Sequence, residues 1–176
     1  MDLEIKKQAF EYLLTQLLNW GAGMTPKVPV LSFTRLKALK LLFFSAAIKD
    51  EQGNDLLGVF DNFYALPNGP VESDIYNYII SDQLTYYTFK NYSFSTKQSY
   101  DEGDLDDNLK VRIRSAVDSL KQKNEQIVAY NAEQLVSLSH IWLAWQDSIN
   151  IARALGKGSF PMDIEKIRNN SQIFTI

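Results

Sequence analysis

Apolar residues recur at spacings of three and four along most of this 176-residue chain, the pattern of helices with one buried face. In the first such segment Phe10, Leu13 and Leu17 share a face, and Lys6 and Glu11 fall outside it. The spacing predicts helices over residues 2–20, 32–49, a segment after residue 107, 131–140, 141–155 and 163–169. Gly21 and Gly23 are expected to end the first helix, and Ser32 to cap the second.

The middle of the chain departs from this pattern, because residues 60–100 hold half of the aromatic residues. Aromatic and β-branched residues favour strands, and short strands are predicted over residues 60–66, 84–89 and 92–95. Gly69 and Pro70 predict the start of an intervening helix, with Pro70 at its first position, where a missing N–H costs nothing.

The expected fold is mainly α, in the α+β class. It is a compact helical domain with a small aromatic-rich antiparallel sheet inserted around the Gly-Pro helix. Residues 1–176 show no linker and no internal repeat, which predicts a single domain. The tail 173–176 is expected either to pair as an edge strand or to stay loose.

Composition removes several classes of chemistry. The chain has no Cys and a single His, His140, which excludes disulfides, thiol nucleophiles and His–His metal pairs. The net charge of −3 does not favour a nucleic-acid or anionic-membrane partner. Residues 156–159 lack the spacing of a phosphate loop, and the acidic run 101–107 lacks that of a calcium loop. We expect no cofactor and no metal, and a cytoplasmic protein without a signal peptide or membrane span.

Two chemical possibilities stay open. His140 could act as a general base with a distant carboxylate in a small hydrolase or transferase, or it could be a structural hydrogen-bonding residue at a helix end. The aromatic stretch 60–100 could be sheet core or a partner surface, because Tyr and Trp anchor protein interfaces.

Three sequence blocks, in this order, resemble the Panacea (SocA-like) domain. The first is Leu39-Lys40-Leu41-Leu42-Phe43-Phe44, similar to a K-L-L-Y-F helix but with Phe43 in place of the family's Tyr. The second is Phe63-Tyr64-Ala65-Leu66-Pro67-Asn68-Gly69-Pro70-Val71, followed by Tyr76, and the third is Leu138-Ser139-His140 with Trp145. The blocks agree with the family in spacing from about residue 10 to residue 168.

The resemblance implies a bacterial antitoxin, sometimes carried by prophages, that binds and neutralises a protein toxin encoded nearby and has no catalytic activity. One branch of the family acts as a proteolytic adaptor that delivers its toxin to an ATP-dependent protease, so an adaptor or scaffold is the alternative. The expected partner-binding residues are those of the blocks: Tyr64, Pro67, Asn68, Gly69, Pro70, Tyr76, His140 and Trp145.

The same residues also have a purely structural interpretation. Gly69 permits a positive φ or a close approach, and Pro70 would direct the exposed start of the helix toward a partner or simply shape the turn. His140 and Trp145 could lock two helices together or could line a groove.

Overall fold

The computed structural model describes residues 2–90, 93–103, 105–169 and 172–175. Its helices are α1 (Leu3–Gly23), α2 (Arg35–Ala47), α3 (Ser73–Ile80), α4 (Asp107–Lys123), α5 (Ala132–His140), α6 (Leu143–Ala154) and α7 (Ile164–Asn169), with 3-10 turns η1 (Val30–Ser32) and η3 (Ile127–Ala129). Its strands are β1 (Phe63–Leu66), β2 (Gly69–Glu72), β3 (Tyr87–Thr88), β4 (Ser95–Thr96) and β5 (Phe160–Pro161). The expected class, mainly helical with a small antiparallel sheet, is confirmed.

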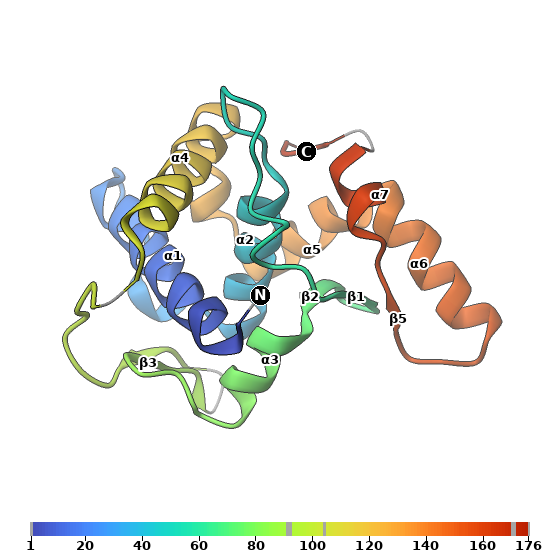
Figure 1. The fold of residues 1–176 in the computed structure, drawn as a ribbon, viewed down its shortest axis with the longest axis horizontal. Coiled ribbons are helices and arrows are strands. Elements are labelled where there is room, and N and C mark those ends of the chain that lie inside the picture. Colours follow the sequence, from blue (N-terminus) through green and yellow to red (C-terminus); the bar gives the residue numbers. More distant parts are fainter. Residues whose placement is uncertain (1, 91–92, 104, 170–171, 176) are drawn as a thin grey trace.

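Helix α2 lies at the centre of the molecule (Figure 1). It contacts α1, α4 and α5, and on another side it contacts strand β2. Every residue from Lys37 to Ala47 is buried, because neighbouring elements cover this helix on all sides. Its apolar residues Leu41, Leu42, Phe43 and Phe44 therefore all belong to the core.

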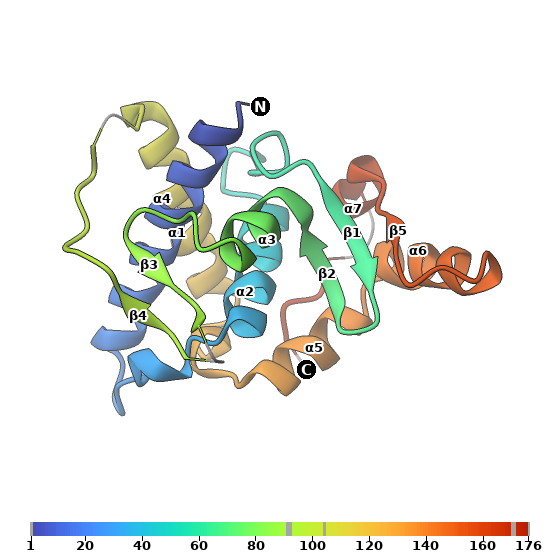
Figure 2. The ribbon, with the colours of Figure 1, turned by 90° about the horizontal axis from the view of Figure 1, so that it is seen from below.

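The main sheet has three antiparallel strands in the order β2-β1-β5. Tyr64 faces Val71 of β2 and Pro161 of β5 across the sheet. Strand β5 was not expected from the sequence, because it is only two residues long and contains a proline. It links the part of the molecule that holds α6 and α7 to the hairpin β1–β2 (Figures 1 and 2).

The prediction that Pro70 opens a helix is wrong, because Pro70 lies in strand β2 and the helix starts at Ser73. Strand β2 is at the edge of its sheet, where a residue without an N–H is tolerated. The carbonyl of Pro70 points away from β1 toward α2, so its nitrogen also lies on the side where no ladder bond is needed. The cap of α3 is Glu72, whose carboxylate accepts from the N–H of Ile75.

Other element boundaries also differ from the expectation. Helix α1 continues through Gly21 to Gly23, and α2 is capped by Thr34 because residues 30–32 form a 3-10 turn. Strands β3 and β4 form a separate two-stranded sheet, and part of the expected strand 92–95 lies outside the described residues. In the tail, residues 172–175 form no strand and Phe174 is buried, whereas residue 176 lies outside the described part.

In the second half of the chain, the structure agrees closely with the helices predicted from the sequence. Asp106 of the acidic run caps α4, and Asn131 caps α5 in a capping box with Gln134. The helices α5 and α6 break at residues 141–142, next to His140, as expected. Gly156 takes a positive φ of 65° just after α6, where a helix C-terminus favours glycine.

Candidate functional site

The three blocks that are distant in sequence meet around the turn between β1 and β2, residues 66–69. From the first block, the Lys40 ammonium donates to the carbonyl of Pro70 at 2.7 Å. From the third block, the Trp145 indole N–H donates to the carbonyl of Leu66 at 3.0 Å. Both sides of the turn are therefore held by side chains from helices, one from α2 and one from α6.

Gly69 is the point where these elements approach most closely. Its φ is +94°, a conformation that L side chains rarely adopt. A Cβ at this position would overlap the hydroxyl of Ser139 and would lie 2.8 Å from Cε of Lys40. The expectation that Gly69 serves a positive φ and a close approach is thus confirmed, in a hairpin turn rather than at a helix start.

His140 stacks on Trp145, with ring centroids 3.8 Å apart and planes 7° from parallel. Burial, followed by the charge of Lys40, lowers the pKa of His140, while a hydrogen bond to the backbone of Pro67 opposes this shift. Pro67 has no N–H, so the imidazole donates to its carbonyl. Because Nε2 is buried without a partner among the described residues, the donor is Nδ1. The ring is therefore neutral at pH 7 and fixed against the turn.

The carboxylate that the hydrolase hypothesis requires is not seen at His140. Within the described ranges, no acidic side chain is within hydrogen-bond distance of the imidazole. The neighbouring Lys40 and Ser139 are fully buried, and the Ser139 hydroxyl donates to the carbonyl of Val136. Burial lowers the pKa of Lys40 to about 7. Lys40 and Ser139 are thus enclosed behind the turn, and the contact of Lys40 with the Pro70 carbonyl positions the backbone of β2.

A groove of about 670 Å³ opens in front of the turn. Figure 2 views the side of the molecule where the tip of the β1–β2 hairpin lies beside α5. Helix α2 and its cap contribute Thr34, Arg35, Leu36 and Leu39, and the hairpin contributes Leu66, Pro67, Asn68 and Val71. The remaining lining residues are Tyr76, Phe89 and Ala132. Elements from four parts of the sequence therefore form one largely apolar concavity.

The expected binding residues divide into three groups. Pro67, Asn68 and Tyr76 line the groove, and Pro67 and Asn68 are exposed. Gly69, Pro70, His140 and Trp145 lie behind the turn and hold it, with His140 half-buried and the other three buried. Tyr64 is half-buried on β1 and does not line the groove.

Sequence reasoning missed the contribution of α2 to this site. Arg35, Leu36 and Leu39 line the groove, and Lys40 supports the turn behind it. A signal for Lys40 was present, because it falls four residues after Leu36 and three before Phe43, on the apolar stripe of its helix. A lysine in such a position must find a buried acceptor or lose its charge.

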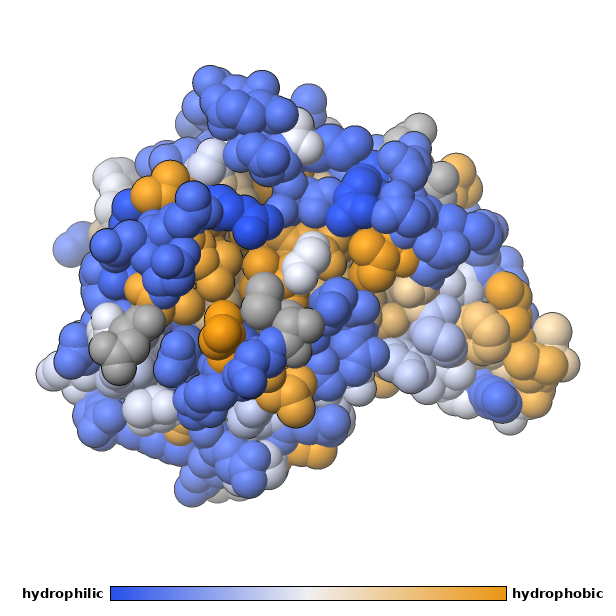
Figure 3. Space-filling model, viewed as in Figure 1, coloured by the Kyte–Doolittle hydropathy of each residue, from blue (hydrophilic) through white to orange (hydrophobic). Residues whose placement is uncertain are grey.

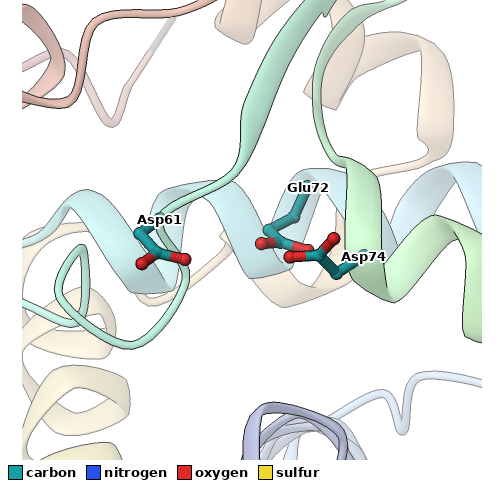
Figure 4. A group of neighbouring side chains, drawn as sticks. All are labelled: Asp61, Glu72 and Asp74. Atoms are coloured by element: carbon teal, nitrogen blue, oxygen red, sulfur yellow. The ribbon is translucent and has the colours of Figure 1, made fainter. Parts of the chain in front are cut away.

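A second polar cluster lies on another side of β2, where three carboxylates converge (Figure 4). Asp61, Glu72 and Asp74 approach one another within 4.8 Å, a spacing that could hold a metal ion. The buried ammonium of Lys6 lies among them, at 2.6 Å from Asp61, 2.9 Å from Glu72 and 2.6 Å from Asp74. Lys6 therefore supplies the positive charge that these carboxylates require.

The expectation that Lys6 and Glu11 lie outside the buried face of the first helix is wrong. Both are almost fully buried, and Glu11 accepts from the N–H of Tyr86 at 2.7 Å. Burial acts to lower the pKa of Lys6, but the hydrogen bonds to the three carboxylates outweigh it and raise the pKa above its usual value. The cluster joins α1 to the start of α3, and its role is to stabilise the fold.

Comparison of the chain with protein-family models, with curated proteins and with solved structures gives no match. The Panacea resemblance therefore stays a prediction that depends on the three blocks. Among the described residues, no helix has both the length and the apolar character needed to cross a membrane.

Proposed function

We propose that this protein is an antitoxin that binds a protein toxin directly and blocks its active surface. One observation carries the proposal: the three blocks that resemble the antitoxin family pack around a single turn, and the first two of them contribute residues to the wall of the apolar groove. If the three blocks had been dispersed over the structure, their residues would have indicated a role in folding alone. The proposed contact is the groove with the exposed residues Pro67 and Asn68 at its rim.

The groove would supply the anchoring part of a larger interface. A stable protein–protein contact buries roughly 800 Å² on each partner, and a few buried anchors at its centre carry most of the binding energy. A groove of about 670 Å³ accommodates several apolar side chains of a partner. Its rigid floor, held by Lys40 and Trp145, favours affinity because little ordering is needed on binding.

A rescue assay tests the proposal. The product of the adjacent gene is expressed alone and together with this protein, and growth is measured. We expect toxicity alone and relief on co-expression. If the neighbouring product is harmless, or if its toxicity is not relieved, the antitoxin proposal fails.

The position of the contact is tested by filling the groove. Asn68→Trp places a large side chain at the rim, and Asn19→Trp places the same side chain at an exposed position on α1. We expect the first variant to lose rescue and the second to keep it, with both proteins folded by circular dichroism. Equal rescue by both variants would exclude this groove as the contact.

A second candidate function is a proteolytic adaptor, which needs a surface for its cargo and another for the protease. Helix α6 offers a second apolar surface, because Leu143, Ile151 and Leu155 are 50%, 41% and 56% exposed. Apolar colour marks this end of the molecule in Figure 3. An adaptor would shorten the lifetime of its partner in the cell, whereas a blocking antitoxin would leave it unchanged or lengthen it, and a chase experiment distinguishes the two.

A further inference from the structure

Among the described residues, Arg35 is the one charged residue that lines the groove, and its charge is not compensated there. Within the described residues, its guanidinium has no carboxylate within ion-pair distance and no hydrogen-bond acceptor. It lies over the ring of Tyr76, 5.6 Å from the ring centre, so a cation–π contact holds it at the groove. Five N–H donors are therefore available to a bound molecule.

The surroundings of Arg35 add to the positive potential. Helix α2 begins at Arg35 and helix α5 begins at Ala132, and both residues line the groove. The N-terminal end of a helix carries a partial positive charge. In the part of the chain that the structure describes, no acidic residue lines the groove, although the chain as a whole has a net charge of −3. The charge that lines the groove is thus opposite in sign to the net charge of the whole molecule, although Glu133 follows Ala132 in the first turn of α5.

The rest of the groove is apolar. Leu36, Leu39, Val71 and Phe89 form its walls, and a fully polar or highly charged ligand would leave these surfaces in contact with water. The occupant that satisfies both features has apolar side chains for the walls and one carboxylate for Arg35.

We infer that the groove binds a segment of the partner protein in which an aspartate or glutamate is flanked by apolar residues. This inference names the chemistry of the partner surface and rests on the proposed function. The carboxylate pairs with the Arg35 guanidinium beside Tyr76, and the apolar neighbours fill the space between α2 and the β1–β2 turn. A charge-assisted, two-pronged contact with arginine gives orientation as well as affinity.

Selection from a phage-displayed library of random dodecapeptides tests the inference without knowledge of the toxin. The baits are the wild-type protein, Arg35→Glu, and Arg153→Glu, which makes the same charge change at an exposed position on α6. We expect the wild type and Arg153→Glu to select peptides with an acidic residue in an apolar context. Those peptides should bind Arg35→Glu at least about tenfold more weakly. Selected peptides without acidic residues, an absence of binders, or equal binding to Arg35→Glu would each overturn the inference.

One further variant and one further measurement distinguish effects on recognition from effects on folding. Arg35→Lys keeps the charge but loses the planar donor fork, so its affinity for the same peptides should fall between those of the wild type and Arg35→Glu. Thermal unfolding should show Arg153→Glu within about 0.5 kcal/mol of the wild type and the Arg35 variants within about 1 kcal/mol, since these lose at most the cation–π contact with Tyr76.

The rescue assay distinguishes this inference from the proposed function. If the wild type rescues and Arg35→Glu rescues equally well, the antitoxin proposal stands and the carboxylate pairing is wrong. If peptides are selected as expected but no rescue occurs with the wild type, the groove chemistry stands and the antitoxin proposal is wrong.

Discussion

Lys6 and Lys40 are both buried on the inner faces of helices, and their ammonium groups have opposite surroundings. Three carboxylates surround Lys6, whereas Lys40 has a single carbonyl acceptor and no carboxylate in the described part of the chain. The pKa of Lys6 is accordingly raised and that of Lys40 is lowered. Lys6 stabilises the fold through its charge, whereas Lys40 is increasingly a neutral donor as the pH rises above 7.

Replacing Lys6 with methionine should destabilise the protein by about 3–5 kcal/mol, because three carboxylates would lose their cation. Lys7→Met is the matched control, since Lys7 pairs with the exposed Glu4 one turn away and lies over the ring of Tyr78, and its loss should cost less than about 2 kcal/mol. Urea unfolding of both variants measures the difference. Equal losses would show that the buried cluster contributes no more than a surface pair.

The stability of the wild type relative to Lys40→Met should rise between pH 7 and pH 9. The folded state releases the Lys40 proton near pH 7 and the unfolded state near pH 10.5, so the unfolded state binds more protons in this range. Stability then rises with pH, by roughly 2 kcal/mol over the two units. Unfolding curves at several pH values measure this, and parallel pH dependence of the two proteins would contradict it.

His140 gives the only imidazole signal of the chain, so its titration can be followed by NMR without assignment. Its midpoint should lie below 6.5, because the ring is partly buried next to Lys40. In Lys40→Met the midpoint should move upward, since the positive charge is removed. A midpoint that is unchanged in the variant would show that Lys40 does not act on the ring.

At the scale of single elements, helices were more predictable than strands. Helical spacing and caps are local signals, and Asp106, Asn131 and Gly156 do what their positions indicate. The strand β2 was missed because a Gly-Pro pair suits both a helix start and an edge strand, and only the pairing with β1 decides between them. The groove could be predicted only in part. The sequence blocks indicate the hairpin residues that line it, whereas the contribution of α2 depends on how elements distant in sequence pack together.

The β1–β2 turn should tolerate no side chain at residue 69. Gly69→Ala combines backbone strain of about 1–2 kcal/mol with overlap against Ser139 and Lys40, so a loss of more than about 2 kcal/mol is expected. Gly53 has a similar φ of +82° with open space around it, and Gly53→Ala should cost the strain alone. Denaturant unfolding compares the two variants, and similar losses would show that the close packing is not limiting.

At the scale of the whole molecule, the C-terminal segment closes the core. Phe174 is buried against Phe44 and Trp142, and its carbonyl accepts from the Asn124 side chain at 2.7 Å. The Trp142 indole N–H donates to the carbonyl of Ile173 at 2.8 Å. Residues 173 and 174 are thus joined to Phe44, Asn124 and Trp142 without any strand.

Phe174→Ala should therefore destabilise the whole protein by about 3–5 kcal/mol, as for other buried aromatic truncations. The exposed neighbour provides the control, and Thr175→Ala should change stability by less than about 0.5 kcal/mol. Thermal unfolding should remain a single transition in both variants. A loss confined to the C-terminal segment, with an unchanged main transition, would contradict this role.

The turn at residues 66–69 has a consequence for the timing of protein synthesis. Translation delivers Lys40 and the hairpin first, whereas Ser139 and Trp145, which enclose and hold the turn, follow about 70 residues after the hairpin. A nascent chain that ends before α6 therefore carries the turn without its support. The proposed capture of a partner then requires synthesis to have passed Trp145, and a chain terminated before this residue should lack it.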